Sequence, residues 1–198
     1  MITTRLRPAA ALLLGTAAAG SLAACSTEYH GHDSGIDGEL WDRMASFEDP
    51  LLTSVFDPLD ETIGILHTMI PEQYPPAVSD PDEYLAGILA PRWDGAAASV
   101  PELGLDQGGA ILYDAVSTES DASFSIFIAS GPRSNGPDDS GRVYSGPSEV
   151  YTCYRFDVRF EADASAHARQ TIYLGCPAEL VDPLADDAAF ASAEVFAG

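Results

Sequence analysis

Four histidines and three cysteines are the residues of this chain best suited to metal binding or nucleophilic chemistry. His30 and His32 form a His-x-His pair with Glu28 and Asp33 nearby, and imidazoles and carboxylates together can bind a divalent metal ion. The pair lies in a polar segment without apolar periodicity, and a flexible segment is a poor preorganised site. We therefore predict no metal site and no cofactor.

His67 and His167 are the other candidates for acid–base chemistry. We expect His67 beside the apolar face of a helix and His167 in a loop, which favours structural and surface roles. The sequence has no Gly-x-Ser-x-Gly, His-Glu-x-x-His or phosphate-binding Gly-Lys-Ser/Thr motif. A Ser-His-Asp set assembled in space stays open, because such sets have no fixed sequence order. We expect no enzyme; a hydrolase that uses either histidine is the least favoured alternative.

Two groups of acidic residues have the composition of calcium ligands. One contains Asp33, Asp37 and Glu39, and the other is Asp138-Asp139. Neither has the Asp-x-Asp-x-Asp-Gly spacing, with a glutamate at the twelfth position, that a calcium loop requires. We interpret both groups as solvated turns.

Cys153 and Cys176 are predicted to form a disulfide. They lie on two strands of one predicted hairpin, and a hairpin loop centred between positions 164 and 165 places them directly opposite one another. An export signal, described below, places them in an oxidising compartment. A redox or metal pair is disfavoured because there is no Cys-x-x-Cys motif and no histidine cluster nearby.

A positive strip is predicted on the polar face of the strand at residues 150–160. Tyr151, Arg155 and Arg159 share this face, and arginine is scarce in so acidic a chain. The strip is the best surface candidate for binding an anionic ligand or partner. The alternative is that the arginines pair with Asp157 and neighbouring acids.

The N-terminus has the pattern of an export signal. Residues 1–8 carry two arginines and no acid, residues 9–19 are apolar, and small residues lead to Leu22-Ala23-Ala24-Cys25. The apolar run is shorter than the roughly 20 residues of a membrane span. Leu22-Ala23-Ala24-Cys25 resembles the lipobox of bacterial lipoproteins, and the resemblance covers the first 25 residues. Apart from the lipobox, the sequence suggests no family.

The resemblance implies that the Cys25 thiol receives a diacylglycerol through a thioether. A lipoprotein signal peptidase then cleaves before Cys25, and residues 1–24 are lost. Two or three acyl chains hold a protein stably on a membrane, since each buried methylene adds roughly 0.8 kcal/mol. The alternatives are an ordinary cleaved signal, with Cys25 incidental, and a retained membrane anchor.

The charge of the chain is strongly negative. All 31 acids follow Cys25 and two of the nine arginines precede it, so residues 25–198 carry 24 more acidic than basic side chains. There is no lysine, and the Ala/Asp/Gly-rich composition resembles that of actinobacterial lipoproteins. Such a charge repels nucleic acid and anionic lipid head groups, which excludes a nucleic-acid-binding role.

Residues 25–38 read as a flexible tether, and residues 39–198 as a single domain. Helices are predicted from residue 39, from Asp57-Pro58 and from Asp80-Pro81, because aspartate caps a helix N-terminus and proline suits its first position. A last helix is predicted from Asp182-Pro183 to about residue 196.

Four strands are predicted at residues 110–117, 123–130, 150–160 and 169–176, from a period of two in apolar residues. The alternation suits an antiparallel sheet with one solvated face. We therefore predict an α+β fold, in which N-terminal helices and a C-terminal helix pack on one face of a four-stranded antiparallel β-meander.

The leading functional hypothesis is a lipid-anchored binding protein at the outer face of the cell membrane, with a cell-envelope protein as partner. The alternative is a small-molecule or lipid carrier with an apolar cavity between helices and sheet.

Overall fold

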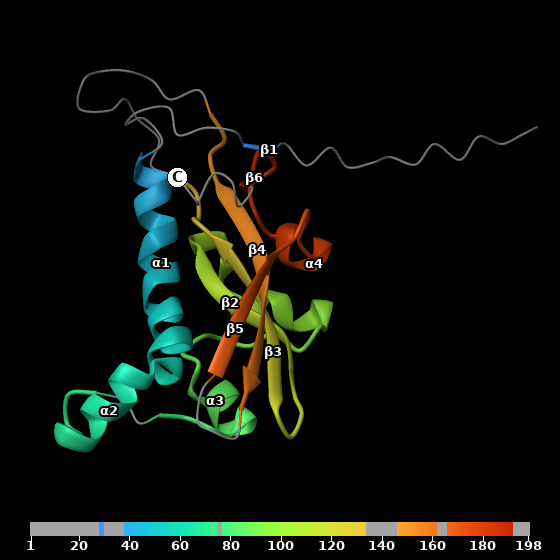
Figure 1. Ribbon diagram of the computed structural model, residues 1–198. Helices are drawn as coiled ribbons and strands as arrows, with labels where there is room; N and C mark the ends of the chain where they lie inside the picture. The colour runs from blue at the N-terminus through green and yellow to red at the C-terminus, as the bar shows by residue number, and fades with distance from the viewer. Residues whose placement is uncertain (1–27, 30–37, 75–76, 134–145, 162–165, 192–198) are drawn as a thin grey trace, which may run out of the picture.

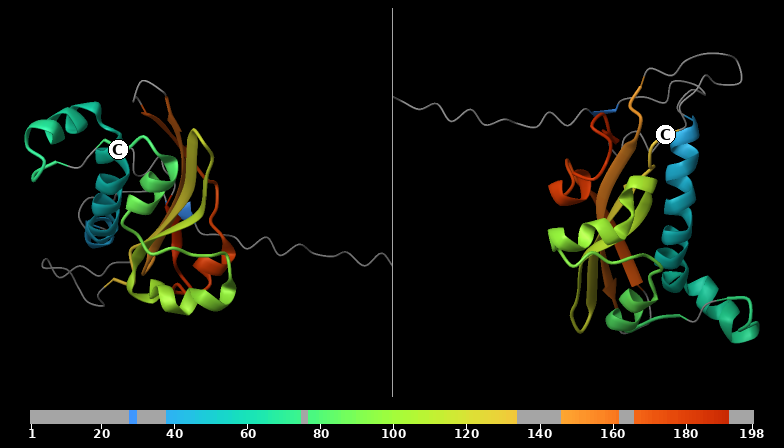
Figure 2. Two further views of the ribbon diagram at one scale, coloured as in Figure 1. Left: turned by 90° about the horizontal axis from the view of Figure 1, so that it is seen from below. Right: turned by 180° about the vertical axis from the view of Figure 1, so that it is seen from behind.

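The computed structural model describes residues 28–29, 38–74, 77–133, 146–161 and 166–191. A long helix lies along one face of a twisted sheet, and short helices cover part of the other face (Figures 1 and 2). The helices are α1 (Gly38–Phe56), η1 (Asp57–Leu59), α2 (Glu61–Met69), α3 (Pro81–Gly87), η2 (Ala97–Leu103), η3 (Leu105–Gln107) and α4 (Ala178–Val181). The strands are β1 (Glu28–Tyr29), β2 (Gly109–Ser117), β3 (Asp121–Ala129), β4 (Val150–Phe160), β5 (Ala166–Ile172) and β6 (Ala189–Ala191).

The sheet is built around an antiparallel meander of β2, β3, β4 and β5. The long strand β4 pairs with β3 on one side. On its other side it pairs first with β6, in parallel, and then with β5. The predicted α+β class and four-stranded meander are therefore confirmed. The short parallel strands β1 and β6 extend the sheet, and β1 lies within the segment interpreted as a tether.

Helix α1 packs on the sheet through a stripe of side chains that are at most 1% exposed: Leu40, Met44, Leu51 and Val55. Their spacing puts them on one helix face. They meet the even-numbered residues of the central strands, among them Phe124, Ile126 and Phe156. Burial of each large apolar side chain contributes roughly 1.5–3 kcal/mol, so this layer is the main core of the fold.

The other face of the sheet has a second, smaller core at one end. It joins η2, η3 and α4 to the odd-numbered residues Phe127, Tyr151 and Cys153. The prediction that all helices lie on one face is therefore wrong. The alternation of apolar and polar residues along a strand shows which side chains share a face. It does not show whether part of the second face is also covered by helices.

The C-terminal helix predicted over residues 183–196 is not present in its described part. A short helix, α4, ends just before Asp182, and the chain then returns to the sheet as β6. Pairing of β6 with the start of β4 and a hydrogen bond from the Ser148 amide to Asp187 hold this path. These tertiary contacts override the helix propensity of the alanine-rich sequence.

Aspartate caps begin α2 and α3. Asp80 accepts the Glu83 amide at 2.9 Å, as predicted for α3. For α2 the cap is Asp60, which accepts the amides of Thr62 and Ile63, rather than the predicted Asp57. Because Asp57 begins the preceding 3₁₀ turn, the helix axis changes direction there, and no residue of α2 is buried.

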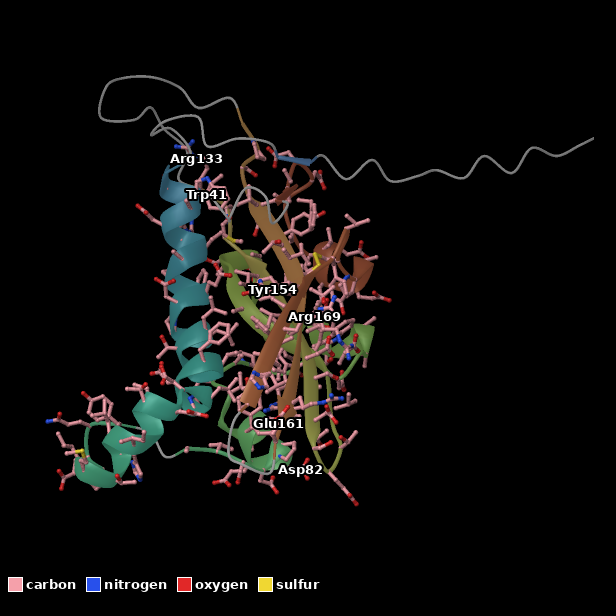
Figure 3. All side chains as sticks on the ribbon, viewed as in Figure 1. Trp41, Asp82, Arg133, Tyr154, Glu161 and Arg169 are labelled. Carbon is pink, nitrogen blue, oxygen red and sulfur yellow. A yellow bond between two sulfur atoms is a disulfide. The ribbon has the colours of Figure 1, made fainter. Side chains whose placement is uncertain are left out.

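A hydrogen bond joins α1 to the sheet beneath it. The Tyr154 hydroxyl donates to the Glu48 carboxylate at 2.7 Å. Tyr154, labelled on the sheet in Figure 3, is buried, and Glu48 is half-buried. Burial raises the pKa of Glu48, the hydrogen bond from Tyr154 lowers it, and the neighbouring Asp49 raises it again. The net pKa is above its ordinary value, so the hydroxyl offsets only part of the cost of burying this carboxylate.

A Tyr154→Phe variant is expected to lose about 1–3 kcal/mol of unfolding free energy at pH 7, because the Glu48 carboxylate loses its buried donor. With its pKa raised in the folded protein, Glu48 binds more protons there than in the unfolded chain. Its contribution to stability therefore improves as the pH falls through the folded pKa. Denaturation at pH 7 and pH 4 checks this, since the deficit should shrink at pH 4. An equal deficit at both would assign the loss to packing alone.

Candidate functional site

The uncovered half of the second sheet face carries rows of polar side chains. In one row, Asp121 of β3 lies opposite Arg159 of β4, which lies opposite His167 of β5. In the next row, Ser123, Asp157 and Arg169 are aligned in the same way across the same three strands. Because neighbouring strands are about 4.8 Å apart, each row brings three polar groups within about 10 Å.

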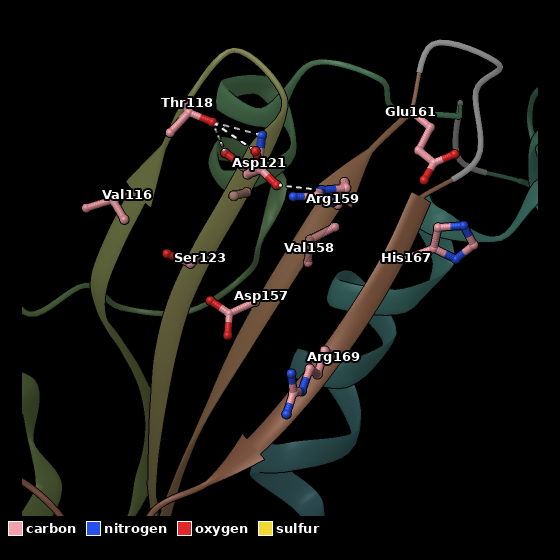
Figure 4. Close-up of a pocket in the computed structure, with 11 residues that line it drawn as sticks. Val116, Thr118, Asp121, Ser123, Asp157, Val158, Arg159, Glu161, His167 and Arg169 are labelled. Carbon is pink, nitrogen blue, oxygen red and sulfur yellow. Dashed lines mark hydrogen bonds and ion pairs between the residues drawn. The ribbon is translucent and has the colours of Figure 1, made fainter.

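These rows line a hollow of about 540 Å³ that is open to solvent (Figure 4). Val116 and Thr118 of β2 and its following turn border the hollow on one side. Glu161, which directly follows β4, borders it on another. The hollow therefore draws residues from four strands, and the sheet positions all of them without a long loop.

Two arginines of this sheet face form ion pairs with aspartates of the same face. The Arg155 Nε lies 2.9 Å from Asp157 Oδ1, and the Arg159 Nε lies 3.2 Å from Asp121 Oδ1. Hydrogen bonds from Ser120 and then from Arg159 lower the pKa of Asp121 below its ordinary value. Asp121 therefore stays ionised over a wide pH range and remains available to Arg159.

Arg169 and His167 are the basic residues of the face that take no part in these ion pairs. Both side chains are exposed, and neither has a hydrogen-bond or ion-pair partner within the described residues. A free guanidinium presents a planar fork of donors that matches carboxylate and phosphate oxygens. The arrangement can bind an anionic group over β4 and β5, with Arg159 beside it.

The predicted positive strip loses Tyr151 and gains Arg169. Tyr151 is on the predicted face but is only 4% exposed, because it packs between Phe127 and Phe190 under the second core. It is therefore not a surface residue. Arg169 was missed, although the alternation of His167 and Arg169 in the last strand is a signal that both share one face.

The predicted disulfide is present between Cys153 and Cys176, with Cα atoms 5.7 Å apart. The predicted register is wrong by three residues. Phe160 pairs with Ala166, so the hairpin is centred on position 163, and Tyr173 donates its amide to the Cys153 carbonyl. β5 ends at Ile172, and the chain then turns, which brings Cys176 to Cys153 from outside the strand.

The described histidines form no catalytic set. His67 Nδ1 lies 2.7 Å from the Tyr74 carbonyl oxygen in the region of α2, far along the chain from the hollow. In the hollow, Ser123 and His167 are separated by β4, which puts them about 10 Å apart. A nucleophile and its base need hydrogen-bond distance. The described residues also contain no group of three or more metal-ligating side chains.

A second hollow of about 300 Å³ lies on the same face, beside the disulfide. It is lined by Tyr113, Asp114, Tyr173 and the segment 175–177. Asp114 has a φ of 49° at an irregularity in the pairing of β2 with β3. Neither hollow lies between the helices and the sheet, which is where the carrier hypothesis requires an apolar cavity.

Several sequence candidates lie outside the described residues. They are Cys25, His30, His32, Asp33, Asp37, Asp138 and Asp139. Within the described part of the chain, no helix combines the length and the apolar character needed to cross a bilayer.

Comparison with known proteins adds no assignment. No protein-family model, no curated protein and no solved structure matches the chain. Its function must therefore be argued from its own residues.

Proposed function

We propose that this protein is a lipid-anchored, extracytoplasmic binding protein that recognises an anionic group in the hollow over β3, β4 and β5. The observation that carries the proposal is the exposed guanidinium of Arg169, which has no partner among the described residues and lies with His167 and Arg159 in that hollow. The surrounding chain is strongly acidic and repels anions at long range. The exposed guanidinium of Arg169 in such a protein favours a short-range contact with one phosphate or carboxylate.

The proposed anchor rests on the lipobox-like stretch that ends at Cys25. The first described residues after it, in β1, pair with β6 at the edge of the sheet. Only two residues separate Cys25 from β1 in the sequence. Lipid attachment at Cys25 would therefore hold the β1 end of the domain close to the bilayer.

Inorganic phosphate is the first probe of the hollow. In a titration followed by backbone amide NMR, we expect saturable shifts at β3, β4 and β5. Arg169→Gln should weaken the apparent affinity about tenfold, because a charge-assisted hydrogen bond of more than about 1.4 kcal/mol is lost. Asp157→Asn should strengthen it several-fold, because it removes a competing carboxylate and releases Arg155.

Arg169→Lys is the matched control, since it keeps the charge but removes the fork of donors. It should fall between the wild type and Arg169→Gln. Shifts that do not saturate, or an affinity indifferent to Arg169→Gln, would contradict the proposal. Acetate at the same ionic strength distinguishes a phosphate preference from a general preference for carboxylate and phosphate.

A further inference from the structure

The segment from η1 to Asp80 forms an arm that projects away from the sheet. It consists of η1, α2 and the returning chain, of which residues 70–74 and 77–80 are described. Both views in Figure 2 show α2 standing clear of the sheet, and Figure 1 shows it at the end of α1 opposite β1. Since no residue of α2 is buried, the arm contributes little to the main core.

Local contacts give this arm a defined shape. Asp60 caps α2, and His67 Nδ1 lies 2.7 Å from the Tyr74 carbonyl oxygen. Gly64 and Ala77 approach so closely that a Cβ at Gly64 would lie 2.7 Å from the Ala77 Cβ. The Val78 amide donates to the carbonyl of Pro58 at the base. The returning chain is thus pinned to the helix at three levels, which a disordered loop would not need.

The arm exposes large apolar side chains at its tip. Ile65 is 63% exposed, Met69 is 72% exposed and Ile70 is 38% exposed. Ile65 and Met69 are four residues apart and lie on one face of α2. Single exposed apolar residues are ordinary, but three within six residues on a pinned, protruding helix form a patch. We name these three residues the apolar tip.

The charge around the tip determines which occupant fits it. Residues 44–91 contain nine aspartates and glutamates and no lysine or arginine. On the arm itself, Asp60, Glu61 and Glu72 are exposed. This rim repels a second copy of the arm and the anionic head groups of a membrane. It attracts a surface that carries lysine or arginine.

We propose that the arm docks into an apolar groove, rimmed by basic side chains, on another protein of the cell envelope. The tip supplies a short helical anchor of the helix-in-groove kind, and the acidic rim selects the partner and speeds association. The direction of the arm rests on the proposed anchoring: with β1 near the bilayer, the arm at the opposite end points away from it. The docking itself does not depend on the anchor or on the hollow.

Site-specific photocrosslinking in cells that make the full chain tests this proposal. A photoreactive residue replaces Ile65, and a matched control replaces Leu174, which is fully exposed and apolar but lies outside the arm. We expect a protein adduct from position 65 and none from position 174. Met69→Asp, or Glu61→Lys combined with Glu72→Lys, should reduce the adduct about tenfold, and binding of the purified partner should weaken at high salt.

The other outcomes overturn the proposal. An adduct of twice the chain mass would show self-association, and a lipid adduct would show that the arm meets the membrane. No adduct, or one that the charge reversals leave unchanged, would show that the acidic rim selects nothing. The replaced residues are exposed, so equal melting temperatures verify that the variants fold. Binding of the purified partner to a Cys25→Ser chain separates failure of the arm from failure of the anchor.

Discussion

Replacing Cys25 with serine is expected to remove the protein from the detergent phase and to abolish incorporation of labelled palmitate. The thioether cannot form without the thiol, so both acyl chains of the diacylglycerol are lost together. One chain gives only marginal, reversible binding, whereas two hold a protein stably. Phase partitioning of the whole-cell protein should fall at least about a hundredfold.

Nothing else in the described chain would replace the proposed anchor. No described helix has the length and apolar character to cross a bilayer, and the acidic surface is repelled by anionic head groups. Ser26→Ala is the matched control, because it changes the adjacent residue and keeps the thiol. A Cys25→Ser protein that partitions and labels as the wild type does would refute lipid attachment at this position.

Most strands could be predicted from the sequence, but the cover on each sheet face could not. β2, β3 and β4 were predicted to within about two residues, because alternation of apolar and polar residues is a local signal. The same signal misplaced Tyr151, since it assigns a side chain to a face without showing what covers that face. Coverage depends on η2, α4 and β6, which meet the sheet from distant parts of the chain.

The helix prediction for the C-terminal segment is wrong for a related reason. Asp182-Pro183 has the composition of a helix start, and the residues after it favour a helix. What the sequence does not reveal is the parallel pairing of Phe190 with Tyr151 of β4. Long-range pairing of this kind outweighs propensities of a few tenths of a kilocalorie per residue.

The candidate site was only half predictable. Arg155 and Arg159 were placed on the right face, but their ion pairs with Asp157 and Asp121 depend on register across three strands. The freedom of Arg169 follows from those same pairs, because Asp157 is already engaged by Arg155. The cation that matters most to the proposed function therefore emerges only from the assembled sheet.

Loss of the disulfide is expected to lower the unfolding free energy by about 3 kcal/mol. Cys153 and Cys176 are 23 positions apart, and closing a loop of this size restricts the unfolded chain by roughly that amount. A Cys153→Ala, Cys176→Ala double variant should therefore unfold at clearly lower denaturant concentration than the oxidised wild type. Reduced wild type should match the double variant, and reductant should not affect the variant.

The disulfide also has a predicted consequence for the hollow. β5 is the exposed edge strand that carries His167 and Arg169, and the bridge fastens the segment just after it to β4. Without the bridge, the end of β5 is held by its pairing with β4 and by the hydrogen bond between the Tyr173 and Ser125 hydroxyls, and amides of β5 should exchange faster than those of β3. Phosphate affinity should fall along with this loosening, even where the rest of the domain is folded. Unchanged exchange in β5 after reduction would show that the non-covalent contacts of β5 hold His167 and Arg169 in place, and that the bridge contributes to stability but not to binding.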